Sequence, residues 1–265
     1  MIKQSAREVV MLRGIYIAGS GMTERAADLE VVANNIANMQ TDTFKRDRVA
    51  YSEFKEMYLN RIQLNEKKEG VGKLAMGSFI STSRFTDFSQ GQLVATTQDH
   101  DVAMDGQGFI KVELPAGDIL YTRCASWEST KDGIMVDKKG NAILDDGGST
   151  IQLEKIGDVM INDSGEILQN GKTIAKMGVY EFDDMSLLEK EGDSLYRLNG
   201  DPAILEKEAA NTFLRQGYVE KANFSPLSVV TDMITILRDY ESSQKVLQSY
   251  DETLDEAITK LGRTQ

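Results

Sequence analysis

A seven-residue repeat of apolar side chains runs along the C-terminal part of the chain, from Leu227 to Leu261. It follows Ser225, a good helix N-cap, and Pro226, a residue favoured at the first helical position. Gly262 supplies a stop signal at the far end. The main track consists of Met233, Tyr240, Leu247, Leu254 and Leu261. An uninterrupted helix of this length spans roughly 50 Å, which is more than a compact domain needs and indicates a coiled coil.

A second apolar track lies beside the first. It consists of Val230, Leu237 and Ile258. Gln244 and Asp251 break this track, and Ile236 and Tyr250 widen the apolar face. Ordinary packing in one globular core is the alternative to a coiled coil, but polar residues at inner positions argue against a dry core.

The N-terminal part carries a similar repeat between residues 15 and 39. Its two tracks are Ile15, Met22, Leu29 and Ile36, and Ala18, Arg25, Val32 and Met39. Only Arg25 is not apolar, so the pattern predicts a helix packed along one seam. Gly19 and Gly21 weaken its first turn, and the regular helix is expected to begin near Met22. Residues 1–10 fall outside the pattern, which makes Met11 the expected functional start.

The repeat ends in the polar stretch "NNIANMQTDTFKR", residues 34–46. Asn34, Asn35 and Asn38 are poor helix formers whose side chains compete for backbone hydrogen bonds. The stretch therefore predicts that the helix ends here and that the chain turns.

The middle of the chain has a different residue pattern, with short segments between closely spaced turns. Turn dipeptides such as Asp105-Gly106 and Asn170-Gly171 separate short β-prone segments, among them "GFIKVEL", "ILYTR", "GIMVD", "AILDD", "TIQLE" and "DVMIN". This spacing predicts an antiparallel β domain. The expected fold is α+β, with N- and C-terminal coiled-coil helices flanking a central antiparallel β domain. Its expected parts are an N-terminal helix (1–45), a connecting arm (46–74), the β domain (75–220) and a C-terminal helix (221–265). The arm could be helical or extended, and "NEKKEGVGK" (65–73) reads as an exposed loop.

The charge of the chain argues against a nucleic-acid partner. Its 265 residues contain 30 Lys and Arg against 42 Asp and Glu, a net charge of −12, and no basic block offers the face that phosphates need. The apolar run Val9–Leu12 is too short for a signal-peptide core, and no run is long enough to span a bilayer. We therefore expect a chain that does not span a membrane and that uses no ordinary cleaved signal.

No group of residues predicts catalysis, a metal site or a cofactor. Asp99, Asp101 and Asp105 resemble part of a calcium loop, but no glutamate closes the loop in register. His100 is the sole histidine, which excludes a histidine metal cluster and a Ser–His pair. The sole cysteine, Cys124, cannot form an internal disulfide and has no base partner. The sequence thus predicts a protein that is not an enzyme and needs no cofactor.

Four segments, taken in order, carry a resemblance to a known family. They are "MLRGIYIAGSGM" (11–22), "NNIANMQTDTFKR" (34–46), "QGQLVATTQDHDVAMDGQGFIKV" with "YTR" (90–112 and 121–123), and "RQGYVEKANFSPLSVVTDMITILRDYESSQKVLQSYDETL" (215–254). These are similar to the opening, the asparagine box, the start of the β domain and the C-terminal helix of bacterial flagellar basal-body rod proteins. The likeness is to the FlgF/FlgG group, which is related to the hook protein.

The resemblance implies a structural subunit that polymerises helically through its terminal helices as part of the axial drive shaft. It also implies delivery by the flagellar type III export apparatus without a cleaved signal peptide, and a location in the periplasmic rod of the basal body. The partners would be other copies of the chain and neighbouring rod proteins. The short stretch after the first helix favours the proximal-rod, FlgF-like member over the distal-rod, FlgG-like one. An alternative from another class is a secreted β-rich carbohydrate-binding protein on a helical stalk, with Trp127 stacking on the sugar.

In such a subunit the asparagine box would end the helix and also contact neighbouring subunits, while helix termination alone is the simpler alternative. The expected subunit interface comprises Ile15, Met22, Leu29, Val32, Asn34, Asn35, Ile36, Asn38, Met233, Leu237, Tyr240, Leu247, Leu254, Ile258 and Leu261.

Overall fold

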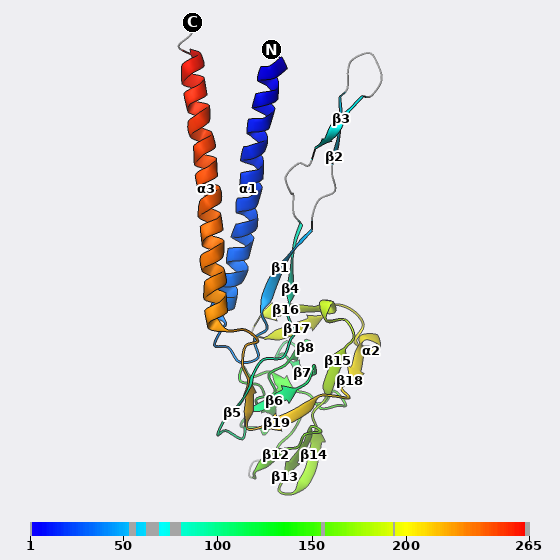
Figure 1. Ribbon diagram of the computed structural model, residues 1–265. Helices are drawn as coiled ribbons and strands as arrows, with labels where there is room; N and C mark the ends of the chain where they lie inside the picture. The colour runs from blue at the N-terminus through cyan, green and yellow to red at the C-terminus, as the bar shows by residue number, and fades with distance from the viewer. Residues whose placement is uncertain are drawn as a thin grey trace. The chain divides into compact units, whose positions relative to one another are not determined.

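The computed structural model describes residues 2–52, 57–61, 69–74, 81–154, 157–192 and 194–262 (Figure 1). The chain forms two compact units, which we describe separately. The helical unit consists of Met1–Ile36, Asp47–Phe85 and Leu227–Gln265, and the β unit consists of Ala37–Arg46 and Thr86–Pro226. The architecture is α+β, with a helix at each end of the chain, as the sequence predicts.

Two long helices dominate the helical unit. Helix α1 (Ile2–Ala37) and helix α3 (Pro226–Gly262) run antiparallel and side by side (Figure 1). Arg25, the charged member of the N-terminal tracks, lies 3.6 Å from Asp239 of α3, between Nε and Oδ2. Neither helix has an apolar stretch long enough to cross a membrane within the part of the chain that the structure describes.

Helix α1 is longer than the sequence predicts. It begins at Ile2 and continues through Gly19 and Gly21, so the expected start of the regular helix near Met22 is wrong. Met11 as the functional start stays a prediction. A glycine inside a helix costs up to about 1 kcal/mol relative to alanine. Two such residues do not outweigh a hydrogen-bond ladder that continues on both sides of them.

Where the structure describes the connecting arm, at residues 46–52, 57–61 and 69–74, the chain is extended and not helical. Strand β1 (Asp47–Ser52) pairs with β4 (Ser81–Thr86), and β2 (Met57–Arg61) pairs antiparallel with β3 (Glu69–Leu74). Residues 69–73 are therefore strand, where the sequence predicted a loop; residues 65–68 lie outside the described part. Arg84 of β4 forms an ion pair with Glu30 of α1 at 2.7 Å.

The β unit holds short strands, and every pairing recorded among its described residues is antiparallel. Its elements are β5 (Leu93–Ala95), β6 (Val102–Asp105), β7 (Phe109–Glu113), β8 (Ile119–Thr122), β9 (Glu128–Ser129), β10 (Met135–Val136), β11 (Ala142–Ile143), β12 (Val159–Ile161), β13 (Glu166–Gln169), β14 (Lys172–Lys176), β15 (Val179–Phe182), the 3₁₀ turn η1 (Met185–Leu187), β16 (Leu188–Gly192), β17 (Leu195–Leu198), α2 (Pro202–Leu205), β18 (Glu206–Glu208), β19 (Phe213–Gln216) and β20 (Tyr218–Glu220).

The largest sheet has the order β16-β17-β8-β7-β11-β10-β9, with β15 also paired to β7 and β18 to β15. Strands β12, β13 and β14 form a separate meander, and the late strands β19 and β20 return to pair with the early strands β6 and β5. The last strands of the β unit, β19 and β20, thus pair with its first strands, β6 and β5.

Local turn chemistry explains one hairpin directly. Gln169 pairs with Lys172, which leaves Asn170 and Gly171 as the two-residue loop between β13 and β14. Their φ angles of 53° and 76° are the left-handed values that such a loop requires and that Asn-Gly supplies. The segment "TIQLE" is a weaker prediction, because it forms only isolated bridges, Leu144 to Thr150 and Ile134 to Gln152.

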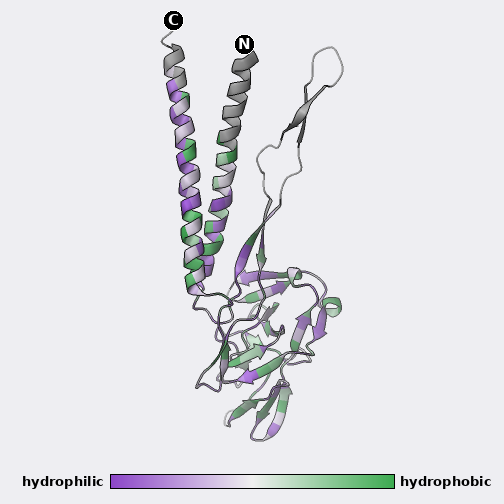
Figure 2. Cartoon of the chain, viewed as in Figure 1, coloured by the Kyte–Doolittle hydropathy of each residue, from purple (hydrophilic) through white to green (hydrophobic). Residues whose placement is uncertain are grey.

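Two apolar clusters fill the β unit. The larger one gathers side chains from both the main sheet and the meander, including Met104, Ile110, Trp127, Ile143 and Ile167. The smaller one is aromatic and contains Phe109, Tyr121, Phe182, Leu188 and Tyr196. Figure 2 shows hydrophobic and hydrophilic residues mixed along these strands, and central strands such as β6 and β8 carry three consecutive buried residues.

Candidate functional site: a buried charge cluster in the β unit

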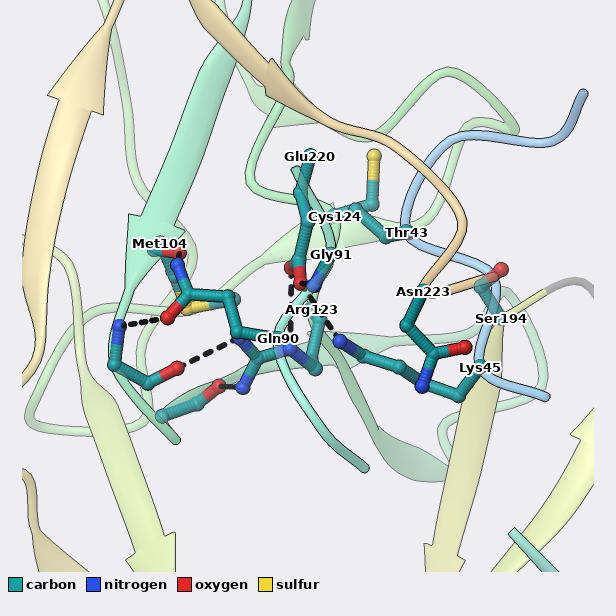
Figure 3. A network of polar contacts seen from close by, with 12 residues as sticks. Thr43, Lys45, Gln90, Gly91, Met104, Arg123, Cys124, Ser194, Glu220 and Asn223 are labelled. Atoms are coloured by element: carbon teal, nitrogen blue, oxygen red, sulfur yellow. Dashed lines mark hydrogen bonds and ion pairs between the residues drawn. The ribbon is translucent and has the colours of Figure 1, made fainter. Parts of the chain in front are cut away.

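Three charged side chains lie together inside the β unit, where water is excluded (Figure 3). Lys45 and Glu220 have no exposed side-chain surface, and Arg123 has 1%. Lys45 Nζ lies 2.7 Å from Glu220 Oε1, and Arg123 Nε lies 3.2 Å from Glu220 Oε2. One carboxylate thus pairs with two cations, one from the beginning and one from the middle of the chain.

Backbone groups complete the coordination of each charge. The Gly91 N–H donates to Glu220 Oε1 at 2.7 Å, and Lys45 Nζ donates to the Ser89 carbonyl at 2.8 Å. Arg123 donates from Nη1 to the Gly108 carbonyl at 3.0 Å and from Nη2 to the Gly106 carbonyl at 2.7 Å. Buried charges need such partners, because an unpaired ion in a medium of low dielectric constant is very costly.

The electrostatic balance of the cluster is uneven, since two positive charges share one negative charge. Burial, and after it the positive charge of Arg123, lowers the pKa of Lys45 from its ordinary 10.5 to about 8, although Glu220 acts in the opposite direction. Lys45 is therefore the member of the cluster that loses its proton first as the pH rises.

A second set of contacts ties the same chain segments beside the cluster. Asn223 accepts the Arg46 N–H at Oδ1 (2.9 Å) and donates from Nδ2 to the Asp87 carbonyl at 2.7 Å. The rings of Phe44 and Phe224 meet edge to face, with centroids 6.2 Å apart. The segment that follows α1 and the segment that precedes α3 therefore lie next to each other within the β unit, near residues 44 and 224.

These chain segments lie so close together that the backbone conformation is restricted at two positions, Gly91 and Thr43. A Cβ on Gly91 would lie 1.9 Å from the Lys221 carbonyl oxygen, so only glycine fits there without a shift of the backbone. Thr43 adopts a φ of 60°, which is uncommon for a residue with a branched Cβ. Its N–H donates to the Glu220 carbonyl at 2.7 Å, which holds it in this conformation.

The arrangement can hold chain segments together but offers nothing for catalysis. The carboxylate of Glu220 is fully engaged and inaccessible to a substrate. In the described residues no three His, Cys, Asp or Glu side chains gather as metal ligands would. Asp101 and Asp105, which resemble calcium ligands in the sequence, form ion pairs with Lys138 and Arg215 instead.

Two further side chains bear on the alternatives weighed from the sequence. Trp127 is only 4% exposed and stacks on His100 with ring centroids 4.4 Å apart, so it is not a surface platform for a sugar. Burial raises the pKa of the Cys124 thiol, which agrees with an unreactive, partly buried side chain.

The predicted interface residues on the N-terminal side differ in burial. Ile15, Met22, Leu29, Ile36 and Asn38 are half-buried, Val32 and Asn35 are buried, and Asn34 is exposed. Asn35 has a role within the chain: its Nδ2 donates to the Asp47 carbonyl at 2.9 Å, and its Oδ1 accepts the Asp47 N–H at 3.0 Å. This amide holds the end of α1 to the start of β1, which is the helix termination that the sequence predicts.

The predicted interface residues on α3 fall on two different faces. The less exposed face is a single seam with steps of four and three residues: Val229, Met233, Ile236, Tyr240, Ser243, Leu247, Tyr250 and Leu254. Leu237 lies off this seam and is 38% exposed. The polar breaks Gln244 and Asp251 are also exposed, so they do not interrupt the seam. The side chains of Ile258 and Leu261 lie outside the described residues. A contact of any of these residues with another subunit stays a prediction.

Sequence reasoning missed the charge cluster as a site. Lys45, Arg123, Glu220 and Asn223 all lie in the four segments quoted for the resemblance, yet nothing in their local sequence marks them as buried. Lys45 and Glu220 are 175 residues apart. The only signal was that three of the four segments, residues 34–46, 90–112 with 121–123, and 215–254, converge here, and that requires the fold.

Sequence models of known families match three stretches of the chain. The flagella basal body rod protein model matches residues 15–45, the flagellar hook protein FlgE/F/G D1 domain model matches 103–169, and the flagellar basal body rod FlgEFG protein C-terminal model matches 215–260. Lys45, Arg123 and Glu220 therefore lie one in each matched stretch.

Similar proteins of known name match almost end to end. The flagellar basal-body rod protein FlgF of Caulobacter vibrioides is 30% identical over 96% of this chain and 99% of its own length. FlgG of Agrobacterium fabrum is 27% identical over 91% of this chain and 96% of its own length. The flagellar hook-basal body complex protein FlhO of Bacillus subtilis is 28% identical over 96% of this chain and all of its own length.

Proposed function

Because the chain belongs to the flagellar basal-body rod protein family, we propose that it is the proximal-rod, FlgF-like member of that family. As a rod protein it is a structural component of the basal body, assembles with other rod proteins and has no enzymatic role. The 30% identity to an FlgF against 27–29% to FlgG proteins favours the proximal assignment by a very narrow margin. The distal-rod, FlgG-like assignment is the second candidate, supported by the near-complete coverage of those proteins.

The subunit polymerises helically through its terminal helices, which pair as a coiled coil. The observation that carries this proposal is the seam on α3, whose steps of four and three residues are those of a coiled coil. Met233, Tyr240 and Leu247 are only half-buried along it. A seam left partly open in one chain gains stability when other copies cover it.

The charge cluster has a mechanical role in this scheme. Glu220 binds the segments on which the chain enters and leaves the β unit, so the two connections to the helices start from fixed, neighbouring points. A rod subunit has to transmit torque through these two connections. Directional hydrogen bonds to buried charges resist sliding better than an apolar contact of the same size.

The subunit reaches the periplasmic part of the rod through the flagellar type III export apparatus. The chain has one cysteine, so no internal disulfide would have to form or open during passage. We expect the Asn34 and Asn38 side chains, at the end of α1 and just beyond it, to contact neighbouring subunits once the rod forms.

The assignment can be tested by deleting the gene and imaging isolated basal bodies by cryo-electron microscopy. A proximal-rod protein predicts that the rod stops within its proximal segment and that complementation with the intact chain restores it. A rod that keeps its proximal part and lacks the distal part would support the FlgG-like assignment instead. An intact rod in the deletion strain would refute membership of the rod.

A further inference from the structure

One part of the β unit, residues 127–153, contains three turns of the same design, and we call it the turn segment. The turns are residues 130–134, 137–141 and 145–149, each with glycine at its fourth position. In each turn the first residue donates its N–H to the carbonyl of the fifth and accepts the glycine N–H at its own carbonyl. A side-chain oxygen of the first residue, which is Thr130, Asp137 or Asp145, accepts the N–H of the fifth. These hydrogen bonds are 2.7–3.1 Å long.

Each of these turns is complete within five residues. Its glycine adopts the left-handed backbone that a hairpin loop of this type needs, with φ angles of 86° at Gly133, 90° at Gly140 and 78° at Gly148. A Thr or Asp side chain that accepts a free N–H stabilises such a turn without any distant partner. The turns can therefore form while the rest of the chain is still unfolded, on the microsecond timescale of isolated hairpins.

The strands between the turns also pair over short distances along the chain. Strand β10 pairs with β9 on one side and with β11 on the other. The longest-range hydrogen bonds recorded inside the turn segment, such as the one from Gln152 Nε2 to the Asp132 carbonyl, span 20 residues. The side chains of Trp127, Met135 and Ile143 belong to the larger apolar cluster. The segment thus contains its own turns, its own strand pairs and part of the core.

The charge cluster is the opposite case, because its contacts join distant parts of the chain. Glu220 is 175 residues from Lys45, 129 from Gly91 and 97 from Arg123. The entropic cost of closing a flexible loop rises with the logarithm of its length, so a loop of 175 residues closes about 300-fold less often than a turn of four. The cluster shown in Figure 3 therefore forms only after other contacts have brought these segments together.

We propose that the β unit folds in a fixed order, in which the turn segment forms first as the nucleus and the charge cluster closes last. The turn segment is shorter than the roughly 40 residues that a domain usually needs to be stable alone. The unit therefore gains most of its stability when Glu220 arrives and the late strands β19 and β20 pair with β6 and β5. The use of this order rests on the proposed function, because a subunit delivered by an export apparatus has to stay open until its C-terminal part has passed.

The refolding and unfolding rates of the intact chain test this order. Trp127 is the sole tryptophan and reports the β unit, and stopped-flow urea jumps give both rates for each variant. Asp137→Ala removes the side-chain acceptor of the Lys139 and Asn141 N–H groups. We expect it to slow refolding by about tenfold and to change the unfolding rate by less than about twofold. Glu220→Gln is expected to do the reverse, with refolding within about twofold of the native rate and much faster unfolding.

Two variants are matched controls for Asp137→Ala. Asp201→Ala removes the same group from a cap outside the turn segment, where Asp201 Oδ1 accepts the Ala203 N–H at 3.0 Å. Its refolding rate should equal that of the native chain. Asp137→Asn keeps an oxygen acceptor, as Asn162 does at the first position of a fourth turn of this design. This variant should recover most of the refolding rate.

Milder variants keep the test decisive if Asp137→Ala or Glu220→Gln does not fold. Thr130 is exposed, and Thr130→Ala removes the hydrogen bond that its hydroxyl accepts from the Ile134 N–H at 3.0 Å. It should slow refolding by about threefold. Lys45→Met leaves Glu220 paired with Arg123 and should raise the unfolding rate alone.

Two results would overturn the inference. Unchanged refolding with faster unfolding in Asp137→Ala and Thr130→Ala would mean that the turns form after the rate-limiting step. Slower refolding in Glu220→Gln and Lys45→Met would mean that the charge cluster belongs to the nucleus. Both results leave the rod assignment intact, because the rates are measured on the isolated chain. The rod assignment is decided separately, by the basal bodies of the deletion strain.

Discussion

The most direct perturbation of the charge cluster is Glu220→Gln. The substitution keeps the size of the side chain and removes one negative charge. Glu220 is the carboxylate to which both Lys45 and Arg123 are bound, at 2.7 and 3.2 Å. In the variant, the Lys45 and Arg123 side chains, which are at most 1% exposed, would face a neutral amide. The NH2 group of that amide is a donor and cannot accept a hydrogen bond from either cation.

The magnitude follows from the burial. Removing one partner of a buried ion pair destabilises a protein by about 3–5 kcal/mol, because the remaining charge stays desolvated. Here two charges are left, although Lys45 can release part of the strain by losing its proton. With a urea dependence of about 2 kcal/mol per molar for a unit of this size, the unfolding midpoint should fall by about 2 M.

The assay is urea unfolding of the β unit in the intact chain. Trp127 is the sole tryptophan, lies in the β unit and is 4% exposed, so its fluorescence reports this unit alone. Glu208→Gln is the matched control: it is the same chemical change, and Glu208 pairs at the surface with Lys176. We expect no measurable change in the control, since exposed ion pairs contribute little.

The reasoning is refuted if Glu220→Gln unfolds within about 1 kcal/mol of the native chain. Such a result would mean that water or another group compensates Lys45 and Arg123. A double-mutant cycle with Lys45→Met then locates the error, because the cycle isolates the coupling between Lys45 and Glu220.

Three further predictions concern other features of the chain. The folded pKa of Lys45, about 8, lies below its ordinary 10.5, so the unfolded chain binds more protons than the folded chain between these two pH values. The free energy of unfolding, measured by urea titration, should therefore rise with pH across this window, by about 3 kcal/mol at most. The variant Lys45→Met should not show this rise. Gly91→Ala should destabilise the β unit because its Cβ would lie 1.9 Å from the Lys221 oxygen, whereas Gly19→Ala, whose Cβ would meet no atom within 4 Å, should raise the helical signal of α1; equal effects in thermal melts would contradict this contrast. Leu247→Asp in the seam should abolish rod assembly while leaving the Trp127 unfolding transition unchanged, and a shifted transition would count against a seam that acts only in assembly.

Features that depend on neighbouring residues could be predicted from the sequence. The start of α3 at Pro226 and the two-residue hairpin at Asn170-Gly171 follow from helix start signals and backbone preferences. The start of α1 was placed too late, because the two glycines were given more weight than the continuous helix on both sides of them. Local signals fix the type of an element better than its ends.

Features that depend on distant partners could not be predicted. Two apolar columns lie next to each other on α3, and a period of seven residues fits Leu237 as well as Ile236. Only the neighbouring helix decides that Ile236 belongs to the seam and that Leu237 lies outside it. Likewise Lys45 and Glu220 read as surface charges until strand β20 pairs with β5 and brings them together.

If the charge cluster has the mechanical role proposed above, its charged residues should matter for geometry more than for stability. Replacing a buried ion triad by apolar residues of similar volume is often neutral or stabilising. We therefore expect the combined variant Lys45→Met, Arg123→Met and Glu220→Leu to unfold within about 2 kcal/mol of the native chain. Its defect should lie in geometry, because methionine and leucine make no directional contacts with the Ser89, Gly91, Gly106 and Gly108 backbone groups.

Hydrogen exchange and motility distinguish geometry from stability. In the apolar variant the amide of Thr43, which donates to the Glu220 carbonyl, should exchange faster although the unfolding free energy is nearly unchanged. Swimming in viscous medium should fail before assembly does, since torque acts on the two segments that the charges hold. Normal swimming together with faster exchange would show that the cluster serves folding alone.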